Sequence, residues 1–246
     1  MLTMKRTFKQ VVLIGSTSEI GLSILNALEY SESARILLVG RTPPEQFSIV
    51  NQKVEVTFQK CDLENFQDIE ILASKLSELE DIDLAIMSSG YLPLENQELN
   101  LSYVHKSMMI NSVGAVSVLS VLANQMHKQD NGLILHISTV ASIQPRLRNF
   151  TYGASKSGAD FFARGLARKY RKTKLKIFVL RPGFVRTKLT HNFRPAPFAI
   201  SKEELANIVT TNFKKQQSIF YAPTKLRLIM NIFRHLPSGI RDILSR

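Results

Sequence analysis

Tyr152 and Lys156 stand four residues apart in the sequence TYGASK, a spacing that places both side chains on one face of a helix. An ammonium group beside a phenol favours the phenolate, so Lys156 is expected to pull the tyrosine pKa from about 10 toward working pH. Such a tyrosine can exchange a proton with an alcohol or a carbonyl oxygen. The pair therefore indicates acid–base chemistry at an oxygen, although a tyrosine and a lysine also occur at this spacing by chance.

A second group of polar residues precedes this pair in the chain. Ser138 and Thr139 follow an apolar run in HISTVAS, and a hydroxyl there can donate a hydrogen bond that polarises the same oxygen. Neighbouring residues on a strand face opposite sides, so only one of the two can point at a substrate. Asn111 lies in a long apolar helical stretch, where an unpartnered amide would be costly. We expect it to hold a water beside Lys156, and a bond to a core backbone group is the alternative.

The stretch VVLIGSTSEIG, residues 11–21, has the form of a strand, a tight turn and the start of a helix. Gly15 permits the turn, Gly21 permits close packing of helix on strand, and the helix N-terminus favours an anion. Glu19 occupies the position where many such turns carry another glycine. A carboxylate there is unfavourable to a pyrophosphate unless the side chain points away. The position after a first strand favours dinucleotide binding.

The residues after the second and third strands bear on the choice of dinucleotide. An acidic residue at the end of the second strand would bind a ribose 2′-hydroxyl, but the chain has Gly40 and then Arg41. Because arginine suits a 2′-phosphate, this position favours NADP. Asp62 follows the third strand and is placed to meet the adenine, with a helix N-cap as the alternative.

Six apolar runs have the character of buried parallel strands. They span residues 11–15, 35–40, 54–59, 83–89, 133–138 and 176–183, and helix-length segments lie at 20–30, 66–79, 102–127 and 153–171. Strands that alternate with helices predict right-handed βαβ units. The expected fold class is therefore α/β, a Rossmann-type doubly wound parallel sheet with helices on both faces.

In such a sheet, ligands bind beyond the carboxyl ends of the strands. After Gly183 the pattern becomes irregular, with Pro195 and Pro197, so this stretch is placed to form a substrate lid. A solvated connector is the alternative. A helix is predicted to begin at Ser201, where Ser201 and Glu204 form a capping box.

The composition fits a single domain, because 246 residues with 44% apolar content can bury a full core. Residues 1–130 are expected to form mainly the dinucleotide-binding half and 131–190 the catalytic half. Residues 191–246 would supply the lid and a basic amphipathic C-terminal segment. Cys61 has no partner for a disulfide within the chain, which indicates a cytosolic protein. No secretory signal and no run of about 18 apolar residues is visible, so we expect no membrane span.

The formal net charge of +12 suits nucleic acid, anionic lipid or a phosphorylated substrate, and much of it fits a solvated surface. Residues 225–246 carry Lys225 and four arginines against one acid, Asp242, with apolar residues between them. This pattern is typical of a segment that lies on a membrane surface, and packing on the core with outward arginines is the alternative. No nucleic-acid motif is present.

Together these features resemble the short-chain dehydrogenase/reductase family over nearly the whole chain. The resemblance implies an NAD(P)-dependent oxidoreductase acting on an alcohol or ketone, with no metal. Its catalytic residues would be Asn111, Tyr152, Lys156 and a hydroxyl that family spacing places on Thr139, with Ser138 as the alternative. The cofactor-binding residues of the family fall on Gly15, Ser16, Thr17, Ser18, Glu19, Ile20, Gly21, Arg41, Asp62, Leu63, Ser89, Gly90, Tyr152, Lys156, Pro182, Gly183, Val185 and Thr187.

Four stretches are similar to one branch of this family, the reductases of decaprenylphosphoryl-2-keto-erythro-pentofuranose. They read GSTSEIGLSIL, RNFTYGASKSG, LRPGFVRTKLT and FYAPTKLRLIMNIFRHLP. The resemblance implies a polyprenyl-phosphate-linked sugar as substrate and decaprenylphosphoryl arabinose, a precursor of cell-wall arabinan, as product. It also implies NADH in slight preference to NADPH, and a flavin-dependent decaprenylphosphoryl ribose oxidase as partner.

Under this interpretation the basic C-terminal segment meets the membrane surface. The expected location is cytoplasmic and peripheral to the inner face of the membrane. The family habit of pairing through long helices implies a homo-oligomer, either a dimer or a tetramer. Another ketone reductase of the family, such as a 3-oxoacyl thioester reductase, is an alternative. A noncatalytic module for nucleotide or lipid is a further alternative, against which the presence of Asn111, Tyr152 and Lys156 argues.

Overall fold

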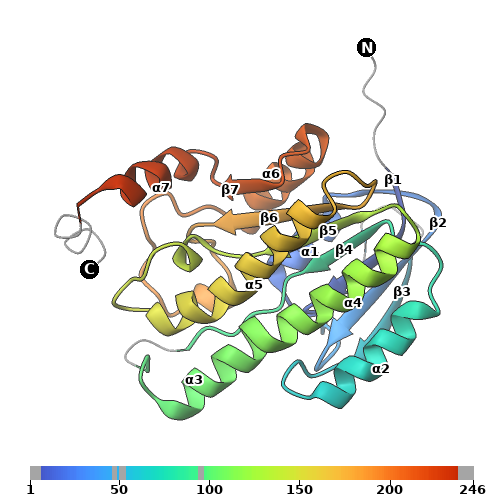
Figure 1. Cartoon of the computed structure of the whole chain (residues 1–246), viewed down its shortest axis with the longest axis horizontal. Coiled ribbons are helices and arrows are strands. Elements are labelled where there is room, and N and C mark those ends of the chain that lie inside the picture. Colours follow the sequence, from blue (N-terminus) through green and yellow to red (C-terminus); the bar gives the residue numbers. More distant parts are fainter. Residues whose placement is uncertain (1–6, 46–48, 50–53, 94–96, 238–246) are drawn as a thin grey trace.

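Seven strands, all parallel, form one sheet in the order β3-β2-β1-β4-β5-β6-β7 (Figure 1). They are β1 (Thr7–Ile14), β2 (Glu29–Gly40), β3 (Val54–Lys60), β4 (Leu84–Met87), β5 (Leu133–Ile137), β6 (Lys176–Pro182) and β7 (Ile219–Ala222). The computed structural model describes residues 7–45, 49, 54–93 and 97–237. The strand order reverses direction between β1 and β4, which marks the point where a doubly wound sheet binds its ligand.

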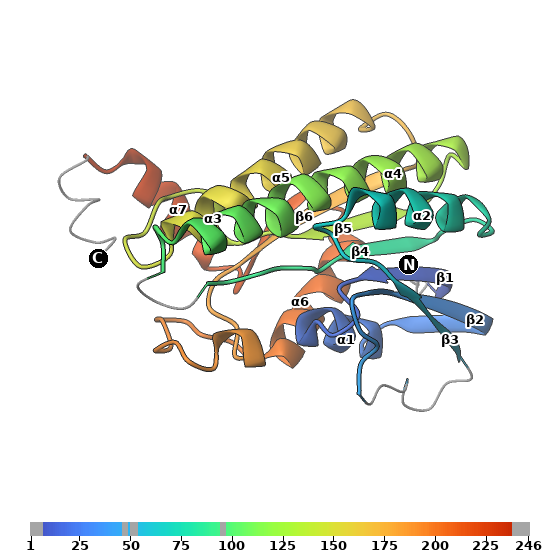
Figure 2. The same ribbon diagram turned by 90° about the horizontal axis from the view of Figure 1, so that it is seen from below.

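Helices cover both faces of the sheet (Figure 2). One layer holds α2 (Phe66–Ser77), α3 (Leu101–Met108), α4 (Ala115–Lys128) and α5 (Phe150–Lys169), and the other holds α1 (Glu19–Asn26) and α6 (Lys202–Lys215). A separate buried cluster lies between the sheet and each layer. The predicted doubly wound α/β fold is confirmed.

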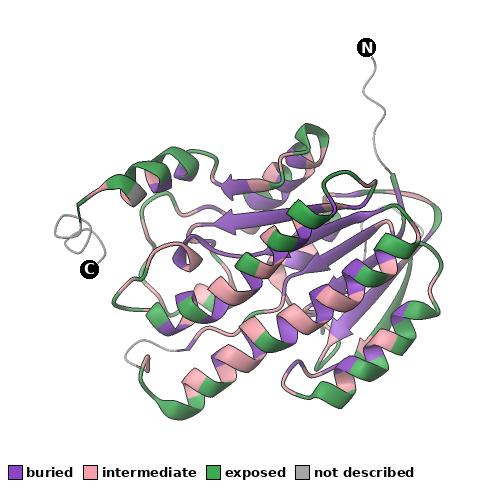
Figure 3. Ribbon diagram, in the orientation of Figure 1, coloured by how far each residue is buried: buried purple, intermediate pink, exposed green. Residues whose placement is uncertain are grey.

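The central strands are buried (Figure 3), and their residues are apolar on both faces because helices cover both. In β5, Leu133, Leu135 and Ile137 face the cluster under α1 and α6, whereas Ile134 faces the cluster under α4 and α5. His136 shares the face of Ile134 because side chains alternate along a strand. It is the one polar residue among the five of this strand.

Two predicted helices differ from those observed, and one observed strand was not predicted. The helix expected at 20–30 ends at Asn26, because Glu29 and Tyr30 already pair with β1. The helix expected at 102–127 is interrupted by a π-helical turn, Met109–Gly114, between α3 and α4. Strand β7 was not predicted at all.

The helix predicted at Ser201 is confirmed. The Ser201 hydroxyl accepts from the Glu204 backbone N–H, and the Glu204 carboxylate accepts from the Ser201 backbone N–H, so the capping box is closed on both sides. Both α6 and β7 fall in the range 191–246, for which a lid and a basic segment were expected. They belong to the sheet and its covering layer, so the irregular connection that precedes them, 183–200, is the part that remains free to act as a lid.

Helix α7 (Leu226–His235) follows β7 at the carboxyl end of the sheet (Figure 1). Its inner side packs through Leu226 and Met230 on Val140 and Tyr221. Residues 238–246 of the basic segment lie outside the described residues.

The described residues include one helical stretch, Leu101–Lys128, with the length and composition of a membrane span. Half of its most apolar window is buried inside the protein. The core helix of a water-soluble protein meets the same criteria, so this stretch is weak evidence for a membrane span.

Candidate active site

A pocket of about 1300 Å³ extends along the carboxyl ends of β1 to β5. It reaches from the turn after β1 to the start of α5 and is bordered by the connection after β6. The residues predicted from sequence that line it are Gly15, Ser16, Thr17, Ser18, Glu19, Ile20, Arg41, Asp62, Leu63, Ser89, Gly90, Ser138, Tyr152, Lys156 and Thr187. The fold therefore gathers residues from seven distant segments into one hollow.

The turn after β1 has the geometry of an anion-binding loop. Gly15 has a φ of +101°, and a Cβ there would lie 2.8 Å from the Ser89 backbone nitrogen, so only glycine fits. The Ser18 hydroxyl caps α1 by accepting from the Gly21 N–H, and it also meets the Ser88 hydroxyl at 2.7 Å. The first backbone N–H groups of α1 open toward the pocket without partners inside the helix. These features fit the pyrophosphate of a dinucleotide.

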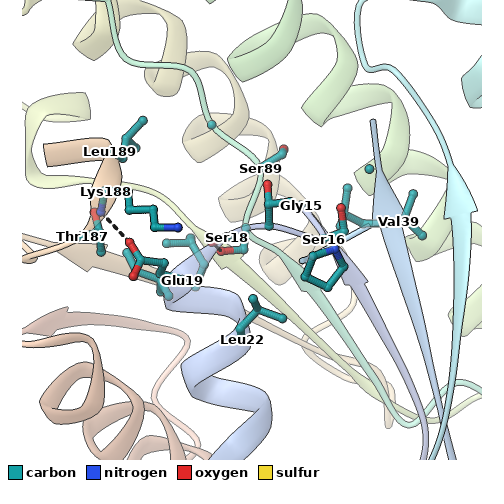
Figure 4. A pocket seen from close by; sticks show the side chains of 18 of the residues that line it. Gly15, Ser16, Ser18, Glu19, Leu22, Val39, Ser89, Thr187, Lys188 and Leu189 are labelled. Atoms are coloured by element: carbon teal, nitrogen blue, oxygen red, sulfur yellow. Dashed lines mark hydrogen bonds between the residues drawn. The ribbon is translucent and has the colours of Figure 1, made fainter. Parts of the chain in front are cut away.

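Glu19 does not turn its carboxylate into this turn. It accepts a hydrogen bond from the Lys188 backbone N–H and one of 2.8 Å from the Lys202 ammonium (Figure 4). Burial alone would raise the pKa of Glu19, but the bonds from Lys188 and Lys202 outweigh burial and hold it below its usual value. The side chain thus points to the connection after β6 and to α6. A glutamate at this position was expected to be compatible with a pyrophosphate only if its carboxylate points away from the turn, and it does.

Arg41 and Asp62 lie at the ends of neighbouring strands, β2 and β3, and line the same pocket. Arg41 is exposed. The Asp62 carboxylate accepts from the Glu64 N–H at 3.1 Å, whereas the N-cap of α2 is Asn65. Asp62 is therefore not the helix cap that was considered as the alternative, and it faces the pocket together with Leu63.

Tyr152 and Lys156 lie on one face of α5 and both line the pocket. The Lys156 ammonium donates to the carbonyl of Ser89 at 2.8 Å and to that of Ile137 at 3.4 Å, so it joins the ends of β4 and β5. Burial lowers the pKa of Lys156 to about 8. Burial also raises the pKa of Tyr152 to about 12. The predicted lowering of the tyrosine pKa is wrong for this arrangement, because burial shifts the pKa of Tyr152 in the opposite direction.

The two candidate hydroxyls have different hydrogen bonds. Ser138 lines the pocket, but its hydroxyl donates to the Asp160 carboxylate at 2.7 Å. Thr139 accepts from the Ala141 N–H at 3.2 Å, and no acceptor for its own proton occurs among the described residues. Ser138 is among the residues that line the pocket and Thr139 is not, so position favours Ser138 as the catalytic hydroxyl. The hydrogen bonds favour Thr139, because no described residue accepts its proton. We give the hydrogen bonds more weight, because a hydroxyl whose only proton is held by a carboxylate cannot donate it to a substrate.

Asn111 lies in the π-helical turn and is fully buried. Its amide oxygen accepts from the Tyr91 N–H at 2.8 Å, and its amide nitrogen donates to the Tyr91 carbonyl at 2.7 Å and to the Ser155 hydroxyl at 3.0 Å. The side chain therefore performs the structural task that was considered as the alternative. It fixes the segment after Gly90, beside the Lys156 ammonium.

Sequence analysis missed a buried ion pair next to this site. Arg181 on β6 makes a two-pronged contact with Asp160 on α5, at 2.9 and 2.7 Å, and also donates to the Tyr221 hydroxyl at 3.1 Å. A signal for it was present, since Tyr152, Lys156 and Asp160 follow one another at intervals of four on one helix face. Through the hydrogen bond from Ser138 to Asp160, the pair also fixes the end of β5.

His136 was also missed. It is fully buried, and neither ring nitrogen has a hydrogen-bond partner among the described residues. Burial lowers its pKa to about 3, with the charge of Lys156 acting in the same direction. The ring is therefore neutral at physiological pH.

Four predicted cofactor residues lie beside the pocket instead of lining it. Gly21 packs α1 on β1, where a Cβ would meet Leu13 at 2.6 Å, as expected from its predicted role. Pro182 ends β6, Gly183 packs against α7, and Val185 is buried. Among the described residues, no group of three or more His, Cys, Asp or Glu side chains is arranged to hold a metal ion.

Comparison with known proteins agrees with this architecture. Residues 9–197 match the family model of the short chain dehydrogenases. An uncharacterized oxidoreductase of Mycobacterium tuberculosis (strain ATCC 25618 / H37Rv) is 30% identical over 68% of this chain and 68% of its own length. The fatty acyl-CoA reductase of Acinetobacter baylyi (strain ATCC 33305 / BD413 / ADP1) is 27% identical over 94% of this chain and 86% of its own length.

Among solved structures, a short-chain dehydrogenase from Sphingobium yanoikuyae in complex with NADPH superposes with a TM-score of 0.75. The alignment covers 94% of this chain and 97% of the other at 16% identity, so it supports the fold alone. The match to the family model extends over most of the chain and includes the turn after β1 together with Tyr152 and Lys156. The chain belongs to the short-chain dehydrogenase family and is an oxidoreductase.

Proposed function

We propose that this protein reduces a ketone to a secondary alcohol with a nicotinamide dinucleotide as cofactor. One observation carries the proposal. Tyr152 and Lys156 of α5 line the same pocket as the Gly15–Ile20 turn, so proton-transfer chemistry and an anion-binding loop share one continuous hollow. When bound, the reduced nicotinamide supplies the hydride.

The residues of the chain supply the proton and the orientation. A phenol whose pKa lies near 12 stays protonated at neutral pH, so Tyr152 is ready to donate its proton to the substrate oxygen as negative charge develops there. Thr139 donates a hydrogen bond to the same oxygen. Lys156 holds the nicotinamide ribose, and Asn111 positions the Tyr91 backbone beside it.

For the substrate, we propose decaprenylphosphoryl-2-keto-erythro-pentofuranose, reduced to decaprenylphosphoryl arabinose, with a flavin-dependent oxidase supplying the ketone. The support is the similarity of four sequence stretches to that branch of the family, including a glutamate in the pyrophosphate turn. The contact of Glu19 with Lys188 and Lys202 gives this glutamate a physical role.

Either nicotinamide dinucleotide fits this proposal. The similarity to the branch favours NADH, whereas Arg41 lines the pocket where a 2′-phosphate would lie. A comparison of the KM values for NADH and NADPH decides between them.

A second candidate is the reduction of an acyl thioester. It is favoured by the relative from Acinetobacter baylyi, which aligns with 94% of this chain. Reduction of a long-chain fatty acyl-CoA to the aldehyde with release of free CoA, with no turnover of the lipid-linked sugar, would select it.

The test couples the purified protein to the flavin oxidase with decaprenylphosphoryl ribose and follows nicotinamide absorbance, with lipid-linked arabinose as the scored product. Tyr152→Phe should lower turnover by about a hundredfold or more, because the acid is lost. Tyr170→Phe, at the other end of α5, is the matched control and should keep full turnover. A Tyr152→Phe enzyme with more than about a tenth of the wild-type rate would exclude Tyr152 as the acid.

A further inference from the structure

Exposed apolar side chains gather around the mouth of the pocket. Of the fourteen large apolar residues that are exposed among those described, eight lie in four segments, 97–101, 143–150, 186–198 and 224–236. We name these four segments the rim. The exposed fractions reach 85% at Leu99, 84% at Leu101, 67% at Leu228 and 65% at Leu147. Apolar residues exposed to this extent and in one region mark an interaction surface.

The four segments of the rim are joined to one another by contacts. The Thr151 hydroxyl, in the residue that directly follows the second segment, donates to the Glu98 carbonyl of the first segment. Helix α7 of the fourth segment packs in one cluster with Val140 and with Ile143 of the second segment. The Lys225 ammonium lies 3.9 Å from the centre of the Phe198 ring, which links the fourth segment to the third. The rim is therefore one continuous border at the carboxyl end of the sheet (Figure 1).

The rim is also strongly cationic. Its four segments contain eight lysines and arginines against one acid, Glu98. Arg148, Arg194, Lys225 and Arg227 are among the exposed cations. Leucines and phenylalanines that alternate with lysines and arginines match the boundary between acyl chains and anionic headgroups of a bilayer.

Helix α7 carries both exposed apolar residues and exposed positive charge. Leu226 and Met230 are buried against the protein, whereas Leu228 and Ile232 are exposed on the opposite side, with Arg227 beside them. The helix therefore has a second apolar stripe that no described part of the chain covers. Figure 3 shows exposed residues along α7 and the neighbouring loops.

We propose that the rim docks on the surface of an anionic lipid bilayer, with the pocket opening toward the headgroups. This inference rests on the proposed function, since a polyprenyl phosphate presents its sugar at that level of the membrane. Leu189 belongs both to the rim and to the lining of the pocket, so the docked surface is continuous with the entrance. A symmetric contact with a second copy would place the same cations against each other, which disfavours that occupant.

The test is flotation of the full chain with vesicles of phosphatidylcholine alone and with vesicles of phosphatidylcholine mixed with phosphatidylglycerol. The wild type should float with the mixed vesicles, and added salt should weaken binding. Leu228→Asn with Ile232→Asn should abolish flotation. Lys225→Gln with Arg227→Gln should weaken binding by about tenfold or more.

Matched control variants lie away from the rim. Ile71→Asn replaces an apolar side chain of α2 that is 57% exposed, and Arg171→Gln with Lys172→Gln removes two exposed cations beyond the far end of α5. Both controls should bind like the wild type. Unchanged thermal unfolding of the rim variants shows that they are folded.

Turnover of the lipid-linked keto sugar in detergent separates this inference from the proposed function. Rim variants that keep wild-type turnover in detergent and lose it on mixed vesicles support docking. A wild type that is active in detergent and does not float overturns docking and leaves the function standing. Rim-dependent flotation without reduction of any ketone supports docking and refutes the function. Rim variants that dissociate an oligomer and float normally assign the rim to a second copy and overturn docking.

Discussion

At the scale of single residues, the hydrogen bonds of each hydroxyl determine whether its proton is free for a substrate. The Ser138 hydroxyl donates its hydrogen bond to the Asp160 carboxylate, whereas the Thr139 hydroxyl accepts from the Ala141 N–H and has no acceptor for its own proton among the described residues. Tyr152 is protonated at neutral pH because burial raises its pKa to about 12. Under the proposed function, these two protons, from Thr139 and Tyr152, would serve one substrate oxygen.

Replacement of Thr139 by valine should lower kcat for ketone reduction by about a hundredfold to a thousandfold, because the hydrogen bond to the developing oxyanion is lost. Thr139→Ser should keep most of the activity. Steady-state kinetics of the two variants measures this difference.

Ser138→Ala serves as the comparison. It should lower the free energy of unfolding by about 1–3 kcal/mol, because the Asp160 carboxylate loses a buried donor. A Ser138→Ala enzyme that loses turnover while Thr139→Val keeps it would reverse the assignment.

The Lys156 ammonium predicts a pH dependence of reduction. Because burial lowers its pKa to about 8, Lys156 loses its charge as the pH rises through that value. Under the proposed function, it then also loses its hold on the nicotinamide ribose. We expect kcat/KM to fall above about pH 8, since this parameter reports the free enzyme. A profile of kcat/KM from about pH 6 to about pH 10 measures the effect, and a flat profile contradicts it.

The same titration acts on stability with the opposite sign. Between about pH 8 and the ordinary lysine value of 10.5, the unfolded chain binds a proton at this position and the folded chain does not. The free energy of unfolding of the wild type should therefore rise with pH through this window. Lys156→Met lacks the group and should lack the rise.

At the scale of secondary-structure elements, α5 is the part that assembles the site. It carries Tyr152 and Lys156 toward the pocket and Asp160 toward β6, where Arg181 holds it. Burial alone would raise the pKa of Asp160, but the bonds from Arg181 and Ser138 outweigh burial and keep the pKa below its usual value. One helix is thus attached to two strands by its own side chains.

Asp160→Asn should lower the free energy of unfolding by about 3–5 kcal/mol at neutral pH, because Arg181 is left buried without a counter-charge. A depressed carboxyl pKa adds stability above the unfolded value of about 3.9, and this stability is lost as pH falls through the folded pKa. The difference between wild type and variant should therefore shrink below about pH 4. Denaturant unfolding at several pH values measures it.

The control for Asp160→Asn is Asp130→Asn, which removes an exposed ion pair with Lys174 at 3.4 Å. An exposed pair of this kind contributes about 0–1 kcal/mol. Equal losses in the two variants would show that the buried pair has no special role.

Elements can be predicted from the sequence where a periodic pattern of apolar residues extends over many positions. The prediction fails for features that depend on a few residues or on tertiary contacts. Six strands and the Tyr152–Lys156 face follow from regular spacing of apolar and polar residues. Strand β7 is a four-residue strand at the edge of the sheet, and its place there follows from tertiary pairing with β6. The π-helical turn at Asn111 has no signature in composition, because it differs from an α-helix only in the spacing of its backbone hydrogen bonds. The Asp160–Arg181 pair depends on tertiary packing that brings α5 onto β6.

At the scale of the whole molecule, one sheet connects both expected halves of the chain. Strand β4 of the first half pairs with β5 of the second, and the pocket crosses this junction. The order of alternating elements was sufficient to predict this arrangement, since right-handed crossovers leave few other topologies. Side-chain positions such as those of Glu19 and Ser138 were not predictable, because they depend on partners more than 20 residues away.

Glu19 belongs to the nucleotide turn by its backbone and to the far wall of the pocket by its carboxylate. A ligand in the turn that shifts the start of α1 would therefore also shift the bonds of Glu19 to Lys188 and Lys202. Thermodynamic linkage makes such a coupling reciprocal for binding free energies. If the cofactor tightens substrate binding by some factor through this carboxylate, the substrate must tighten cofactor binding by the same factor.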